Sequence, residues 1–191
     1  EGEPTGPARE SLVTVVWGPT GAPGRTTVAV NLAAEHAVAG RNTLLVDLDT
    51  YGPAVGVHLG LTEESAGVAR AVRRADHGRL GAADLAAAGV RVRVAGADLT
   101  VLTGLTRVDR WPELHPAAVS ALIAAAREHW DRVVVDVGFG LEQDEELSFD
   151  VPAPQRNGAT LAALAAADEV IAVGGPDAVA LPRLVRGVEE L

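Results

Sequence analysis

One run of residues decides the fold of this chain: Val15-Val16-Trp17-Gly18-Pro19-Thr20-Gly21-Ala22-Pro23-Gly24-Arg25-Thr26-Thr27. An apolar segment precedes its glycines and an alanine-rich segment of helical character follows them, which predicts a strand-to-helix turn. Such a turn lets backbone amides and the positive end of the helix converge on one anion. The two prolines have no amide to donate. The predicted phosphate-binding residues are therefore Gly21, Ala22, Gly24, Arg25, Thr26 and Thr27.

The spacing of the glycines narrows the choice of ligand. Gly18, Gly21 and Gly24 recur as G-x-x-G-x-x-G, whereas dinucleotide-binding proteins use G-x-G-x-x-G. A nicotinamide or flavin site is therefore the weaker interpretation. A glycine-rich turn without any ligand is the other alternative, and the strand and helix expected on either side favour the phosphate loop over it.

Strands and helices are expected to alternate along the chain. Short apolar runs predict strands, and apolar residues at helical spacing predict helices. Strands too apolar for a half-exposed sheet, separated by helices, indicate an α/β fold with three layers and a doubly wound, mostly parallel sheet. The expected strands are 12–17, 43–48, 91–95, 99–102, 132–137 and 169–173. The expected helices are 26–39, short ones between 52 and 89, one through Val119, Leu122, Ile123 and Ala126, 159–167, and a last one with Leu181, Leu184, Val185 and Val188 on one face.

Acidic residues mark the ends of two of these strands. Asp47 lies at the end of the run 43–48, Asp49 directly follows it, and Asp136 stands at the end of 132–137. Ligands of doubly wound folds bind at the carboxyl ends of the strands, so these carboxylates should lie beside the loop. Thr26 stands where a hydroxyl would ligate a Mg²⁺ that bridges two phosphates, and Asp136 resembles the aspartate that orders the water around this metal. A strand-end aspartate that only caps a turn is the alternative.

Composition restricts the class of protein. The 191 residues carry a net charge of −10, and all 16 basic residues are arginine. This negative net charge argues against electrostatic binding of nucleic acid by the domain as a whole. A local basic face would be formed by Arg70, Arg73, Arg74 and Arg79. The chain has no cysteine, its histidines lack metal-ligand spacing, and no run reaches the roughly 18 apolar residues of a membrane span. We expect a cytoplasmic protein.

The domain organisation is expected to be simple. Residues 1–10 are polar and rich in proline and glycine, which indicates a flexible linker or a domain edge. Residues 11–191 are long enough for a single domain with one hydrophobic core. The helix expected at the end of the sequence suggests that the chain continues beyond Leu191.

The motifs together resemble the MinD/ParA family of P-loop ATPases. The deviant Walker A motif of this family reads K-G-G-x-G-K-T-T, and its register here covers residues 20–27. Its D-x-D motif matches the end of Leu44-Leu45-Val46-Asp47-Leu48-Asp49, its later strand-end aspartate matches Asp136, and Asn31-Leu32-Ala33 is also typical. The resemblance runs from residue 12 to the end of the chain. Within the family, the chain looks most similar to the actinobacterial MinD-like proteins related to CpaE and TadZ.

The resemblance implies a ligand and a role for each matched position. The family binds ATP or ADP with Mg²⁺ and forms a homodimer around two ATP molecules. By this correspondence Thr26 would bind Mg²⁺, Asp136 would hold it through water, and Asp47 would support the metal and the neighbouring switch segment. Asp49 would orient the attacking water, and Arg25 would stand in the place of the catalytic lysine.

Two positions depart from the motif. Thr20 replaces the lysine that reaches across the dimer to the partner's phosphates, and a threonine can neither reach nor neutralise them. Arg25 replaces the local lysine with a planar, bulkier fork. Since phosphoryl transfer depends on positioning, where about 1 Å of error can cost on the order of 100-fold, we expect nucleotide binding with weakened hydrolysis. Normal turnover and complete loss of binding are the alternatives.

The resemblance leaves more than one function open. The first is an ATP-dependent positioning protein of the septum site, the partitioning chromosome or pilus assembly, which recruits a protein partner or cargo as a homodimer. The second is a pseudo-ATPase scaffold that has lost its catalytic cycle and works through protein–protein contacts. A small-molecule enzyme on the same fold is a third, but no further acid, base or nucleophile in the sequence supports it.

Overall fold

The computed structural model describes residues 11–61, 66–78, 80–143 and 154–191. The linker expected at 1–10 and Arg79 of the expected basic face lie outside these residues. Within them, no helix is both long enough and apolar enough to cross a membrane.

Six strands form one sheet, in the order β3-β4-β2-β5-β1-β6. Neighbouring strands run parallel, apart from the antiparallel pair β3 and β4. This arrangement confirms the predicted α/β fold with a mostly parallel sheet. The strands are β1 (Leu12–Trp17), β2 (Thr43–Leu48), β3 (Val90–Val94), β4 (Ala97–Leu102), β5 (Arg132–Val137) and β6 (Glu169–Ala172).

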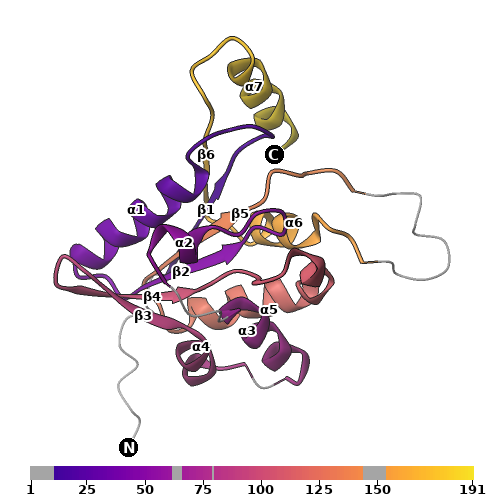
Figure 1. Ribbon diagram of the computed structural model, residues 1–191. Coiled ribbons are helices and arrows are strands. Elements are labelled where there is room, and N and C mark those ends of the chain that lie inside the picture. Colours follow the sequence, from indigo (N-terminus) through magenta and orange to yellow (C-terminus); the bar gives the residue numbers. More distant parts are fainter. Residues whose placement is uncertain (1–10, 62–65, 79, 144–153) are drawn as a thin grey trace, which may run out of the picture.

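Helices cover both faces of the sheet (Figure 1). On one face, Val16, Leu45 and Val134 pack in a cluster with the alanines of α1, and on the other Val15, Leu44 and Val135 pack with α3, α5 and α6. Because successive side chains of a strand point to opposite faces, strands this apolar need a helical layer on each side. The helices are α1 (Arg25–Val38), α2 (Val55–His58), α3 (Gly67–Asp76), α4 (Ala82–Ala88), the 3₁₀ turn η1 (Val108–Glu113), α5 (Pro116–Arg127), α6 (Gly158–Ala165) and α7 (Ala180–Glu190).

A two-residue boundary difference from the sequence-based prediction lies in the β3–β4 hairpin. The turn was expected at 96–98, but it is formed by Ala95 and Gly96, and β4 begins at Ala97. Both turn residues have positive φ, 47° and 88°, as the tight two-residue hairpin turn requires. The turn was misplaced because alanine at positive φ gives no signal in a sequence.

The last helix also differs from what its pattern suggested. Its expected apolar face is largely unpacked, since Leu181, Val185 and Val188 are each half-exposed, at 54%, 54% and 50%. In Figure 1, α7 stands apart from the helices that cover the sheet. Close contacts with the rest of the described chain include those of Gly187 with the Trp17 ring and of Leu184 with Gly174.

Candidate phosphate and magnesium site

The loop between β1 and α1 has the geometry of an anion cradle. Gly21 and Gly24 have positive φ, 78° and 94°, which only glycine adopts without strain. Gly24 precedes α1, and among the described residues no side chain caps the first amides of this helix. Those amides belong to Arg25, Thr26 and Thr27, so the helix presents unsatisfied donors and its positive dipole end at the loop.

The structure brings Thr26 and Asp136 together, as the strand-end argument predicted. The Thr26 hydroxyl donates to Asp136 Oδ2 over 2.6 Å, although 110 positions separate the two residues. Burial raises the pKa of Asp136 to about 6. Its second oxygen, Oδ1, is buried and has no hydrogen-bond partner in the described part of the chain.

This pair fits a magnesium ion. A hydroxyl and a carboxylate with an unsatisfied oxygen are the hard oxygen ligands that Mg²⁺ prefers, and Mg²⁺ keeps several waters that could satisfy Oδ1. An orphaned buried carboxylate oxygen is costly without such a partner. Thr26 and Asp136 are therefore the residues of this chain that would hold the metal beside the loop.

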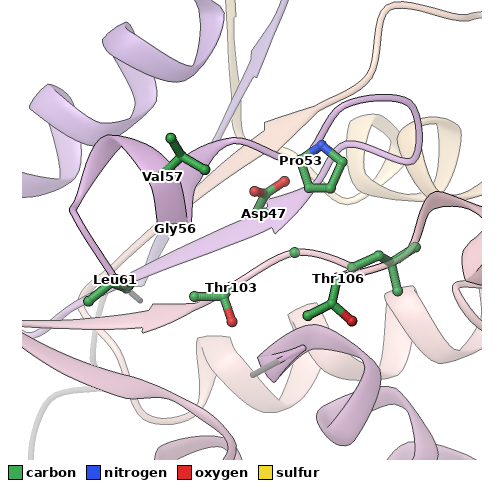
Figure 2. A pocket seen from close by; sticks show the side chains of 9 residues that line it. Asp47, Pro53, Gly56, Val57, Leu61, Thr103 and Thr106 are labelled. Carbon is green, nitrogen blue, oxygen red and sulfur yellow. The ribbon is translucent and has the colours of Figure 1, made fainter. Parts of the chain in front are cut away.

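Asp47 lies deeper, one strand away. Its register partner in β5 is Asp136, and its two oxygens accept the amides of Asp49, at 3.2 Å, and Val55, at 3.0 Å. Burial and the neighbouring Asp136 carboxylate raise the pKa of Asp47 to about 8. In Figure 2 the carboxylate lies beside Pro53. Both residues line a hollow of about 130 Å³, together with Gly56 and Val57 of α2. These contacts show Asp47 bracing the segment that leaves β2, and its part in metal binding stays a prediction.

Asp49 is held by the turn that follows it. Its Oδ1 accepts the amides of Tyr51, at 2.7 Å, and Gly52, at 3.0 Å. Its Oδ2 lies 3.5 Å from the Arg25 guanidinium. One oxygen of the predicted water-orienting carboxylate is thus committed to local structure, and the other faces the loop arginine.

Arg25 folds back into its own loop. Its Nη1 donates to the carbonyl of Gly18 at 3.2 Å and, at a longer 3.5 Å, to that of Pro19, while Nη2 faces Asp49. The side chain is only 16% exposed. The guanidinium therefore has carbonyl and carboxylate partners already, and it would have to leave some of them to contact a phosphate.

A hollow of about 150 Å³ lies over the start of α1, and most of the predicted loop residues line it. His58 of α2 is a lining residue that the sequence interpretation missed. Its Nδ1 lies 3.0 Å from the Ala54 carbonyl, which makes Nδ1 the donor, and its Nε2 is then the acceptor for the Thr27 hydroxyl at 3.5 Å. A four-residue helix leaves no periodic pattern, so nothing in the sequence placed His58 here. The lining residues are Ala22, Gly24, Arg25, Thr26, Thr27, Asp49, Gly52 and His58.

Solved structures share this architecture. A ParA family ATPase from Chlorobium tepidum TLS superposes with a TM-score of 0.74 at 20% sequence identity, over 95% of this chain and 69% of that one. The chain has the fold of the MinD and ParA ATPases. The cell division ATPase MinD of Pyrococcus furiosus gives a TM-score of 0.66 at 18% identity, and the septum site-determining protein MinD of Pyrococcus horikoshii OT3, complexed with Mg-ADP, gives 0.64 at 19%.

The shares of the two chains that align, and their sequence identity, determine what these comparisons show about this protein. The two MinD comparisons cover 92% and 94% of this chain, but only 64% and 63% of the MinD chains. No protein-family model and no curated protein sequence matches the chain. At this level of identity the likeness concerns the fold alone, so residue roles depend on the geometry described above.

Proposed function

We propose that this protein binds ATP with Mg²⁺ at the loop of residues 21–27. The observation that carries the proposal is the 2.6 Å hydrogen bond from Thr26 to Asp136. In the part of the chain that the structure describes, the buried Asp136 Oδ1 has no partner and the start of α1 has no side-chain cap. A hydroxyl, an orphaned carboxylate oxygen and a set of free amides are what a metal-bound phosphate needs. A glycine-rich turn without a ligand would have no use for the orphaned oxygen.

Each residue of this site then has a part in binding. The amides at the start of α1 donate to phosphate oxygens, with Gly21, Ala22 and Gly24 shaping the turn that aims them. Thr26 supplies a metal ligand, and Asp136 orients the water shell. When bound, Mg²⁺ supplies positive charge that offsets the charge of the phosphates.

We further propose that hydrolysis is weak. Arg25 already has Gly18, Pro19 and Asp49 as partners, and the planar fork adapts less readily to a transition state than a lysine ammonium. Asp49, the carboxylate proposed to orient the attacking water, has one oxygen in its own turn and the other opposite Arg25. Both groups would have to rearrange before catalysis.

At the level of the cell, we propose a nucleotide-dependent homodimer that positions a protein partner or cargo in the cytoplasm. The fold shared with MinD and ParA ATPases supports this role. Septum placement, chromosome partitioning and pilus assembly are the settings we consider, in line with the resemblance to the CpaE and TadZ branch. The pseudo-ATPase scaffold remains the second candidate, because Arg25 and Asp49 occupy each other in the structure.

Nucleotide binding is tested by a matched pair of threonine variants. Thr26→Ala removes the proposed metal ligand. Thr27→Ala keeps the backbone amide that is proposed to bind phosphate and removes only a hydroxyl that faces His58. Calorimetric titration should show Mg²⁺-dependent ATP binding by the wild type, a loss of about 10- to 100-fold in Thr26→Ala, and little change in Thr27→Ala. Equal affinities for all three proteins would contradict the metal assignment. No binding by the wild type at millimolar nucleotide would overturn the proposed function.

Release of phosphate separates the two candidates. A slow wild-type rate that Asp49→Ala abolishes supports the positioning ATPase. Tight binding without release, in both proteins, supports the scaffold. Size-exclusion chromatography with ATP and with ADP then tests whether the dimer depends on the nucleotide.

A further inference from the structure

A second arginine reaches the loop from the far end of the chain. Nη1 of Arg183, on α7, lies 3.4 Å from the Thr20 carbonyl. The same nitrogen lies 3.1 Å from the point where a Cβ at Gly21 would stand. The guanidinium therefore rests on the loop at its glycine, where an added Cβ would push it aside by a few tenths of an ångström. Figure 1 shows α7 and the β1–α1 loop at the same end of the molecule.

Close packing places this arginine. Gly187, one turn further along α7, is so near the Trp17 ring that an added Cβ would stand 2.4 Å from Cη2. Leu184 packs in the same way on Gly174, where an added Cβ would stand 2.8 Å from its side chain. Because Trp17 ends β1 and leads into the loop, and Gly174 follows β6, these contacts fix the helix at the ends of these two strands, beside the base of the loop.

The loop needs positive charge that its own residues do not offer. The chain contains no lysine, and the Arg25 guanidinium is turned inward to two carbonyls and Asp49. A nucleotide triphosphate carries several negative charges, which proteins meet with cations aimed at the phosphate oxygens.

Arg183 is able to supply that charge. It is exposed, and no ion pair engages it in the described part of the chain. Its bond to Thr20 is long for an N–H···O hydrogen bond, so little is lost when it is exchanged for a stronger partner. A guanidinium fork also suits phosphate oxygens, to which it can donate two parallel hydrogen bonds.

We propose that Arg183 is the phosphate-binding cation of this loop, supplied by α7. This inference rests on the proposed nucleotide binding. In the nucleotide-bound protein, the guanidinium leaves the Thr20 carbonyl, passes over Gly21 and pairs with phosphate oxygens. The same residue thereby couples α7 to the occupancy of the loop.

Substitutions of Arg183 separate the effect of its positive charge from the effect of its hydrogen bond to the Thr20 carbonyl. Arg183→Gln keeps a donor for the Thr20 carbonyl but removes the charge, and Arg183→Lys keeps the charge. Arg186→Gln is the matched control, since Arg186 lies on the same helix, lines the same hollow of about 240 Å³ and makes no hydrogen bond to the loop. Circular dichroism checks that each variant is folded.

Calorimetric titration with Mg·ATP is the measurement. We expect Arg183→Gln to weaken binding about 10-fold or more, with Arg183→Lys and Arg186→Gln within about 3-fold of the wild type. Equal affinity in Arg183→Gln and Arg186→Gln, with a wild type that binds, overturns the assignment of Arg183 and leaves the proposed function standing. A wild type that binds no nucleotide overturns both.

Discussion

In the centre of the sheet every residue of β2 is buried, whereas at its margin β6 exposes Glu169 and Val170, and α7 beyond it exposes most of its apolar side chains. The two regions meet the loop from opposite sides. Thr26 and Asp136 are positioned from the centre, and Arg183 is positioned from the margin. The metal side of the site is therefore held by buried residues, whereas the α7 side is held by a helix whose apolar face is largely exposed, and we expect α7 to be the easier of the two to displace.

The largest expected effect is on stability and comes from a matched pair of leucines. Leu44→Ala opens a cavity at a fully buried position of β2 and should lower the free energy of unfolding by about 2 to 5 kcal/mol. Leu181→Ala, at the half-exposed margin, should change it by less than about 0.5 kcal/mol. Urea denaturation measures both. A large loss from Leu181→Ala would show that the α7 face is packed in solution.

The next effect is a gain in stability at the metal side of the site. The pKa of Asp136 rises from 3.8 to about 6 on folding, so stability falls as the pH rises through this interval and the carboxylate loses its proton. Asp136→Asn removes this cost and should stabilise the metal-free protein by about 2 to 3 kcal/mol at pH 7 to 8. The gain should vanish below about pH 4, where the wild-type carboxyl is protonated in both states.

Thermal unfolding of the metal-free protein across this range of pH provides the measurement. Asp136→Asn should at the same time weaken the binding of Mg·ATP, because the orphaned oxygen no longer belongs to a carboxylate. A variant that is less stable than the wild type at pH 8 would show that the buried carboxylate stabilises the fold on its own.

Gly187→Ala tests the contact between α7 and the Trp17 ring. In a free helix, alanine in place of glycine stabilises by up to about 1 kcal/mol. Here the added Cβ would meet Trp17 at 2.4 Å, so we expect α7 to be displaced and the overpacking to cost about 1 to 3 kcal/mol. Hydrogen exchange over residues 180–190 should then be faster than in Val188→Ala, an exposed control. Slower exchange would mean that α7 does not rest on Trp17.

The smallest effect is expected at Asp168, which directly precedes the edge strand β6 and bonds it to its surroundings. Asp168 Oδ2 accepts the Val13 amide at 2.8 Å and Arg127 Nη1 at 2.7 Å, and the Arg127 hydrogen bond lowers the pKa of Asp168 below 3.8. Asp168→Asn should cost about 1 kcal/mol at pH 7, allowing for solvent screening at this partly exposed pair. The hydrogen bond from Arg127 stabilises only the ionised carboxylate. The difference in stability between Asp168→Asn and the wild type should therefore disappear as the pH falls below about 3.8. A constant difference down to pH 2 would contradict the ionic contribution.

Most of the centre could be predicted from the pattern of residues. The limits of β1, β2 and β5 were predicted to the residue, because six-residue, mostly apolar runs bounded by polar residues or glycine have few alternatives. The meeting of Thr26 with Asp136 followed from the rule that parallel strands end at one edge. The inward fold of Arg25 could not be predicted, since it depends on where the carbonyls of Gly18 and Pro19 point.

The margin shows the limit of such patterns. The spacing of Leu181, Leu184, Val185 and Val188 predicts an amphipathic helix, and α7 is one, but spacing does not say whether the apolar side is covered. His58 and Arg183 were likewise missed as loop neighbours. Each reaches the loop through a contact between elements distant in the sequence, 31 positions apart for His58 and Thr27 and 163 for Arg183 and Thr20.

The order of residues alone was sufficient for the α/β class, the strand-to-helix loop and the absence of lysine from it, because these depend on local composition and periodicity. Only the folded structure shows which residues stand near the loop in place of the missing lysine. Which arginine turns inward, which carboxylate oxygen is left without a partner, and which distant helix brings a second guanidinium to Gly21 are set by packing across the sheet. Such contacts join residues that the chain keeps far apart, and only the tertiary arrangement brings them within hydrogen-bond distance.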